Sequence, residues 1–175
     1  MKLSLKKLGS PITEGAEGFI YHWQDQYVIK QFKDESQLPL KQKKLELLMS
    51  KNLHPSIVKP LDLVFNTNNK FIGYMMKKIQ GEEIKRLSNR KFIRTNQLKK
   101  DQIIILLIKI SETLQNLHKN NIFIGDLNDR NILFDLNFEP YFIDCDSWHI
   151  ENYPCNVAME LFMDPLLKKN NFNSN

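Results

Sequence analysis

The chain has few of the residues that mark secreted, membrane-embedded or zinc-binding proteins. Its 175 residues include only two cysteines, Cys145 and Cys155, and their separation fits no metal-binding spacing. We therefore expect reduced thiols and a cytoplasmic protein. The longest apolar run, Ile103 to Ile108, is too short to cross a bilayer, and the charged stretch that follows Met1 lacks the apolar core of a signal peptide. We expect no membrane partner.

The composition allows a packed core but says little about ligands. Hydrophobic residues make up 42% of the chain and the formal net charge is +5. This length suits one domain or two small lobes, and the charge permits binding to nucleic acid without arguing for it. The densest basic run, residues 85–100, contains no aromatic residue except Phe92. We interpret it as a solvated connector and expect no nucleic-acid partner.

Apolar periodicity predicts an α+β fold. Strand-like patterns occupy residues 26–32, 61–65 and 71–76, and a helix is expected over 37–51. The clearest helix is 101–120, whose apolar stripe is Ile103, Leu107, Ile110, Leu114 and Leu117. Its first half is apolar nearly all round, which indicates a helix that is buried on several sides.

Three polar residues lie in two short loops flanked by strand-like segments. Asp126 and Asn131 are five residues apart, so they do not stack on one helix face but can face one pocket from a tight loop. Asp144 follows the apolar run Tyr141 to Ile143 and is expected at a strand end. A carboxylate there can hold a hard cation such as Mg²⁺ through oxygen ligands. The alternative is a polar hairpin turn in some other α/β domain.

At these residues the chain resembles the protein kinase family, in its bacterial or phage serine/threonine form. That family carries a catalytic loop H-R-D-L-x-x-x-N and a metal-binding D-F-G. The first reads here Ile124-Gly125-Asp126-Leu127 through Asn131, and the second reads Asp144-Cys145-Asp146. The resemblance implies Asp126 as the catalytic base, and Asn131 and Asp144 as Mg²⁺ ligands.

Upstream, a glycine turn and a lysine follow the same pattern. Gly15 and Gly18 match two glycines of the kinase G-x-G-x-x-G-x-V, Ile20 replaces its valine, and Thr13 replaces its first glycine. An ordinary hairpin turn is the alternative; a dinucleotide site would need a helix next, whereas strand-like residues follow. Lys30 ends a segment like V-A-I-K, which implies contacts with the ATP phosphates. Taken alone, it would equally be a lysine snorkelling to the surface.

The expected helix 37–51 supplies one acid, Glu46, among several lysines. The resemblance makes Glu46 the catalytic partner that holds Lys30 on the phosphates, and the alternative is a solvated charge. The following His54-Pro55-Ser56-Ile57-Val58 is close to the H-P-N-I-V segment of many kinases. We take His54 as structural.

The segment after residue 76 looks like the hinge between kinase lobes. The resemblance puts Met76 near the back of the adenine pocket, with backbone groups of Lys77 and Ile79 bonding the adenine. An edge strand that runs into a loop is the alternative. The implied fold is a two-lobe kinase-like fold, with a small β-rich N-lobe at 1–78 and a truncated helical C-lobe at 79–175.

The chain departs from the kinase pattern in several places. Ile124 and Gly125 replace the His and Arg of H-R-D, and Asp146 in place of the D-F-G glycine is either a further metal ligand or, slightly preferred, a solvated acid. Residues 157–165 look like the end of an activation segment, or else an unrelated surface segment. Several later kinase helices are absent from this sequence, so part of the helix face at 103–110 would be bare. We infer a homodimer, a partner that covers helix 101–120, or a fragment.

Three functions are consistent with these residues. The first is an ATP- and Mg²⁺-dependent protein kinase that phosphorylates serine or threonine of a protein substrate. The second is a pseudokinase, a nucleotide-binding regulatory module. The third is a small-molecule phosphotransferase, because such enzymes also use a G-D-x-x-x-x-N loop followed by I-D. The completeness of the set Lys30, Glu46, Asp126, Asn131 and Asp144 favours the first.

Overall fold

The computed structural model describes residues 1–4 and 8–155, which form two compact units. Unit 1 comprises Met1–Asn52 and Lys59–Lys78, and unit 2 comprises Leu53–Val58 and Ile79–Asn175. The expected division after residue 78 had grouped 53–58 with the first part, whereas these residues pack with the second. Helices and antiparallel sheets occur together, so the expected α+β class is confirmed.

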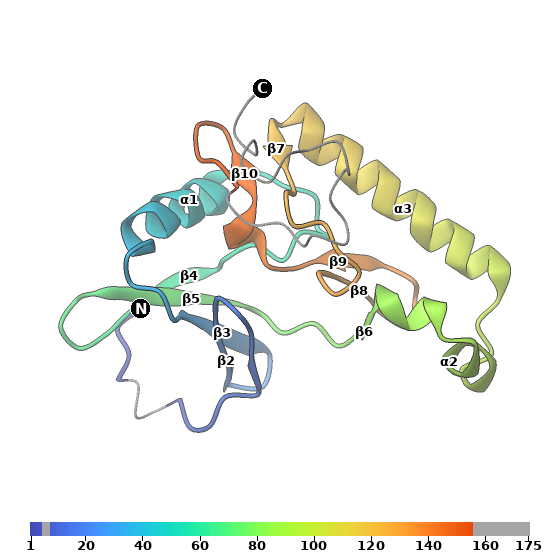
Figure 1. Ribbon diagram of the computed structural model, residues 1–175, viewed down its shortest axis with the longest axis horizontal. Coiled ribbons are helices and arrows are strands. Elements are labelled where there is room, and N and C mark those ends of the chain that lie inside the picture. The colour runs from blue at the N-terminus through green and yellow to red at the C-terminus, as the bar shows by residue number, and fades with distance from the viewer. Residues whose placement is uncertain (5–7, 156–175) are drawn as a thin grey trace. The chain divides into compact units, whose positions relative to one another are not determined.

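Unit 1 is built on a five-stranded antiparallel sheet in the order β1-β2-β3-β5-β4 (Figure 1). The strands are β1 (Thr13–Glu14), β2 (Gly18–Trp23), β3 (Tyr27–Phe32), β4 (Asp62–Phe65) and β5 (Phe71–Lys77). One helix, α1 (Leu38–Ser50), packs against β4 and β5. The strands β3, β4 and β5 and the helix α1 fall where the apolar patterns predicted them, within one or two residues, whereas β1 was not predicted.

The core of unit 1 contains side chains from the two neighbouring strands β3 and β5 and from α1. Ile29 of β3, Tyr74 of β5 and Leu45 of α1 are fully buried, and each apolar side chain of this kind contributes about 1.5–3 kcal/mol on burial. Gly73 of β5 faces Gln31 of β3, and a Cβ at residue 73 would lie 2.0 Å from the Lys30 carbonyl oxygen. Only glycine fits at this close approach.

Unit 2 combines helices with two small antiparallel sheets, in the orders β6-β8-β9 and β10-β7 (Figure 1). Its elements are β6 (Glu82–Glu83), the 3₁₀ helix η2 (Ile84–Ser88), α2 (Arg90–Thr95), α3 (Lys100–Lys119), β7 (Ile122–Phe123), β8 (Ile132–Phe134), β9 (Pro140–Phe142), the 3₁₀ helix η3 (Cys145–Ser147) and β10 (His149–Ile150). Helix α3 packs against β7 and β9.

The long helix α3 buries one stripe only. Leu106, Ile110, Thr113 and Leu117 recur at helical spacing and are buried. Around the rest of the helix, Ile104, Ile105, Leu107 and Ile108 are 48–56% exposed. Burial on several sides is therefore wrong, because the strands β7 and β9 lie on one side only, whereas the expected bare face is present. In the described part of the chain, no helix is long and apolar enough to cross a membrane.

The segment Leu53–Val58 joins unit 2 through the edge of β9. Ile57 forms a parallel bridge with Phe142. The backbone N–H of Val58 donates to the Phe142 carbonyl oxygen at 2.9 Å, and the Phe142 N–H donates to the Ser56 carbonyl oxygen at 2.7 Å. His54 Nδ1 accepts from the Ser56 N–H at 3.3 Å, which is a structural role, as expected for this histidine.

Candidate functional site

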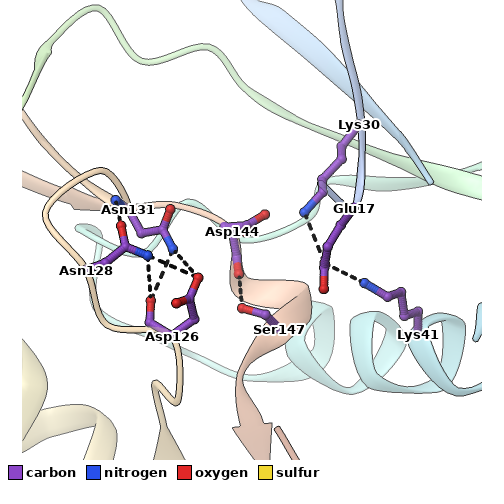
Figure 2. A network of polar contacts seen from close by, with 8 residues as sticks. All are labelled: Glu17, Lys30, Lys41, Asp126, Asn128, Asn131, Asp144 and Ser147. Atoms are coloured by element: carbon purple, nitrogen blue, oxygen red, sulfur yellow. Dashed lines mark hydrogen bonds and ion pairs between the residues drawn. The ribbon is translucent and has the colours of Figure 1, made fainter. Parts of the chain in front are cut away.

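The loop from Asp126 to Asn131 is closed by side-chain amides that hold one carboxylate. Asn131 Nδ2 donates to Asp126 Oδ2 and to the Asp126 carbonyl oxygen, both at 3.1 Å. Asn128 Nδ2 donates to the same two acceptors, at 3.0 and 3.2 Å (Figure 2). Two of the three residues predicted to act together are thus in direct contact, and Asp126 is fixed by two neutral donors.

Asn128 is a site residue that the sequence prediction missed. Its side chain is buried, and its Oδ1 accepts from the backbone N–H groups of Arg130 at 2.9 Å and Asn131 at 3.1 Å. This is the geometry of an Asx turn, in which a side-chain oxygen replaces a backbone acceptor. The available signal was an asparagine two residues before the residue whose N–H it binds, inside a loop already marked by Asp126.

The hairpin of β8 and β9 brings Asp144 to the end of this loop. Ile132 pairs with Phe142, and the Ile143 N–H extends the ladder by donating to the Asn131 carbonyl oxygen at 3.0 Å. Asn131 and Asp144 therefore flank the same end of the hairpin. The structure brings together all three polar residues that the sequence singled out in these two loops.

Asp144 adopts a left-handed backbone conformation, with φ of 64°. This conformation is uncommon for a non-glycine residue, although aspartate tolerates it better than most residues do. The Asp144 carbonyl oxygen accepts from Ser147 Oγ at 2.9 Å (Figure 2), which turns the chain into η3. Such local strain at a half-buried carboxylate is typical of functional sites.

Asp146 is buried, whereas the preferred prediction was an acid in contact with solvent. Its side chain is 1% exposed, so a solvated acid is wrong at this position; η3 turns residues 145–147 inward, and Cys145 is also fully buried. The Cys145 thiol donates to the Val58 carbonyl oxygen at 3.7 Å, which anchors the segment after Asp144 to residues 53–58. The remaining interpretation of Asp146, a further metal ligand, stays a prediction.

In unit 1, Lys30 lies within the sheet and not at its surface. Its side chain is 6% exposed, so the snorkelling alternative is wrong. Glu17 Oε2 lies 3.8 Å from Lys30 Nζ and 2.7 Å from Lys41 Nζ of α1 (Figure 2). Burial of Lys30 is tolerable because carboxylate charge is close to it.

Glu46 lies elsewhere on α1. It is exposed and accepts a hydrogen bond from Gln42 Nε2 at 2.9 Å, one helical turn away. Glu17, from the glycine turn, does lie near Lys30, and the sequence prediction did not single it out. No local pattern marks Glu17, because its contact with Lys41 joins residues 24 positions apart.

The glycine turn joins β1 to β2. The Gly15 N–H donates to the Gly18 carbonyl oxygen at 2.9 Å, so in this conformation that N–H closes the turn. A Cβ on Gly18 would lie 2.3 Å from the Gln31 carbonyl oxygen, which explains the glycine without any ligand. Ile20 pairs with Lys30 across β2 and β3, which sets the turn in register with the lysine. Phosphate contacts by this turn stay a prediction.

The predicted adenine-binding residues lie where the chain leaves β5. Met76 is buried, whereas Lys77 ends the strand and is exposed. The Lys78 N–H donates to the Gln26 carbonyl oxygen at 2.8 Å, and Ile79 is the first residue that returns to unit 2. Adenine contacts by Lys77 and Ile79 stay a prediction.

The hairpin end offers oxygen donors of the kind that Mg²⁺ prefers. Asn131 directs its amide nitrogen to Asp126, so the amide oxygen points away from that carboxylate, and Asp144 lies at the same hairpin end. One carboxylate, one amide oxygen and phosphate oxygens suffice for Mg²⁺. Residues 1–4 and 8–155 contain no cluster of three or more His, Cys, Asp or Glu suited to a metal.

One earlier expectation lies outside the described residues. The segment expected to end an activation loop, 157–165, belongs to the part of the chain that the structure does not describe. His118 of α3 lies within the described part and stacks on Phe123, with ring centroids 5.1 Å apart.

Compared with models of known protein families and with curated proteins, the chain gives no match.

Proposed function

We propose that the chain is an ATP- and Mg²⁺-dependent protein kinase that transfers the γ-phosphate to a serine or threonine hydroxyl. The observation that carries the proposal is the contact of Asn131 with Asp126, together with the hairpin that sets Asp144 beside Asn131. A carboxylate held by two amides, next to oxygen donors for a hard cation, suits a reaction that depends on positioning and charge neutralisation.

Each residue has a specific role in this proposal. Asp126 orients the attacking hydroxyl and accepts its proton, while the hydroxyl oxygen bonds to the γ-phosphorus and the bond to the bridging β–γ oxygen breaks. Asn128 and Asn131 keep the Asp126 carboxylate in one orientation. Asn131 and Asp144 would hold Mg²⁺, which supplies positive charge to the phosphate oxygens when bound. Lys30 adds a buried positive charge in unit 1.

The arrangement of Glu17 favours one competing function, a nucleotide-binding pseudokinase. Lys30 lies near Glu17, and Glu46 is exposed on α1. In active protein kinases the lysine pairs with a glutamate of the following helix, whereas Glu46 here bonds to Gln42. The matched substitutions Glu17→Gln and Glu46→Gln test which acid a kinase requires, whereas a pseudokinase shows no turnover in the wild type or in either variant. A kinase that uses Glu46 loses turnover only in the second variant.

The experiment that tests the proposal is Mg²⁺-dependent formation of ADP and of phosphoserine or phosphothreonine on a generic protein acceptor. Asp126→Asn and Asp144→Ala should each lower turnover by about a hundredfold or more. Asp129→Asn is the matched control, because Asp129 lies in the same loop and, among the described residues, its side chain makes no hydrogen bond or ion pair with Asp126 or Asn131. This variant should retain turnover.

Three outcomes decide between the functions. Phosphate transfer lost in both variants and kept in the control supports the proposal. Nucleotide binding without transfer in the wild type indicates the pseudokinase, and transfer to small-molecule acceptors alone indicates the small-molecule phosphotransferase. Turnover that is equal in the wild type, Asp126→Asn and Asp144→Ala removes the site assignment.

A further inference from the structure

The strongest charge feature of unit 2 is a basic surface formed by η2, α2 and the start of α3. Residues 84–100 contain seven Lys or Arg residues and no Asp or Glu. Six of the seven are exposed: Arg86, Arg90, Lys91, Arg94, Lys99 and Lys100. We call these six residues the basic surface. Its charge exceeds the net charge of the whole chain, which is +5.

Part of this charge is not compensated within unit 2. Lys85 pairs with Glu83, and Arg86 Nε lies 3.3 Å from Glu82 Oε2. Among the described residues, no carboxylate forms an ion pair with Arg90, Lys91 or Arg94 of α2. Arg94 lies one turn after both Arg90 and Lys91, so these three charges lie close together on α2 and repel one another. An anionic partner would relieve that repulsion.

The basic surface is connected directly to the candidate catalytic loop. The Lys85 N–H donates to the Asp129 carbonyl oxygen at 3.0 Å, and Asp129 lies between Asp126 and Asn131. Glu83 of β6 pairs with Leu133 of β8, and a Cβ on Gly81 would lie 2.6 Å from the Phe134 carbonyl oxygen. These contacts hold the start of η2 against the hairpin that carries the site.

The surface is presented on fixed backbone. Asn89 caps α2, since its Oδ1 accepts from the N–H groups of Lys91 at 2.9 Å and Phe92 at 3.1 Å. The Arg86 guanidinium lies 4.7 Å from the centre of the Phe92 ring. Phe92 is the only aromatic residue in 84–100, and the arginine already covers it. A nucleic acid would therefore find charge here but no free ring on which to stack a base.

We propose that the basic surface binds acidic segments of the protein substrate, so that the chain phosphorylates serine or threonine near runs of Asp or Glu. This inference rests on the proposed kinase function, because it names the substrate class of that site. Charge complementarity identifies the partner: three uncompensated cations on α2 match a carboxylate-rich peptide, and their element is joined to the loop of Asp126.

The test is a binding measurement that does not require turnover. A fluorescent peptide with one serine beside a run of glutamates is titrated with the full chain, and its anisotropy is followed at low and high salt. The patch variant carries Arg90→Glu, Lys91→Glu and Arg94→Glu. The control variant carries Lys2→Glu, Lys43→Glu and Lys119→Glu, which are exposed lysines outside the basic surface and give the same change in net charge.

We expect the patch variant to bind the acidic peptide about tenfold more weakly than the control variant does. Binding by the wild type should weaken with salt, and a peptide with glutamine in place of glutamate should bind poorly. A milder variant, Arg90→Gln, Lys91→Gln and Arg94→Gln, should lie between wild type and patch variant; it preserves the test if charge reversal unfolds α2. In turnover assays the patch variant should raise KM for the acidic peptide and leave kcat unchanged.

Equal weakening in the patch and control variants, or no preference for the acidic peptide, would overturn the inference. A single-stranded oligonucleotide of matched charge that displaces the peptide and binds more tightly would overturn it in favour of nucleic acid. Failure of the kinase proposal is separate, because it appears as absent phosphate transfer whatever the anisotropy shows.

Discussion

Asn128 should be the residue on which the geometry of the candidate catalytic loop most depends. Its amide makes four hydrogen bonds, two donated to Asp126 and two accepted from the N–H groups of Arg130 and Asn131. Each such bond contributes about 0.5–1.5 kcal/mol net. Asn128→Ala removes all four, but exposed Arg130 can bond to water, and the Asn131 N–H keeps its bond to the residue 128 carbonyl oxygen at 3.3 Å. We therefore expect a loss of about 2 kcal/mol.

Asn128→Asp separates the donor bonds from the acceptor bonds. An aspartate retains the two bonds accepted from the backbone but places a second carboxylate where an amide nitrogen now lies 3.0 Å from Asp126 Oδ2. Two ionised carboxylates at that distance repel, so this variant should be less stable than Asn128→Ala at neutral pH. The penalty exists where both carboxyls are ionised and disappears as the pH falls far enough to protonate one of them.

Urea denaturation followed by tryptophan fluorescence measures these changes, because Trp148 is 1% exposed in the same unit. A loss of about 2 kcal/mol also lowers Tm by about 4–8 °C for a chain of this size. Asn137→Ala is the matched control: Asn137 is an exposed asparagine in the β8–β9 turn, and its substitution should change stability by less than about 0.5 kcal/mol. If Asn128→Ala matched this control, or Asn128→Asp were as stable as wild type, the Asx-turn account would be refuted.

Two further predictions concern single contacts. Gly73→Ala should destabilise unit 1 by about 2 kcal/mol or more, because the new Cβ would lie 2.0 Å from a backbone oxygen; the loss is measured as a lower Tm. Gly15→Ala is the control, since its Cβ would lie 3.9 Å from the nearest atom, and it should change Tm little. Burial, followed by the nearby Asp135 carboxylate, raises the pKa of Tyr141 above its usual 10.0. The neutral Tyr141 phenol therefore contributes to the free energy of unfolding below about pH 10, and this contribution is lost as the pH rises through the pKa of Tyr141 in the folded protein. Asp135→Asn should lower the pKa of Tyr141 in a tyrosine absorbance titration, whereas Asp129→Asn should not, and an unchanged value in both would exclude this cause.

The elements that the sequence predicted well are those whose periodicity is local. The helix α3 and the strands β3, β4 and β5 lie within one or two residues of their expected ranges, because apolar spacing over a few turns or pleats determines them. The short elements η2, α2 and β6 were not predicted. They depend on contacts such as the pairing of Glu83 with Leu133, which no short window contains.

In the candidate site too, the residues fixed by local sequence were predicted and those fixed by tertiary packing were missed. Asp126, Asn131 and Asp144 were found because two loops flanked by apolar strands bring them within a span of nineteen residues. Glu17 was missed and Glu46 was chosen, because the acid beside a buried lysine is decided by tertiary packing of the glycine turn. The burial of Asp146 was missed for the same reason, since nothing in Cys145-Asp146-Ser147 indicates that η3 turns inward.

Residues 53–58 belong to unit 2, although they lie in the sequence between the two segments of unit 1. A single cleavage of the chain therefore cannot separate the two units. Cleavage between Lys78 and Ile79 would yield a fragment that still carries Ser56 and Val58, whose backbone partner Phe142 lies in the other fragment. The two pieces should therefore co-purify after a nick at this point. For the same reason, residues 1–78 could be transplanted into another protein only if that protein offered residues 53–58 a strand edge equivalent to β9.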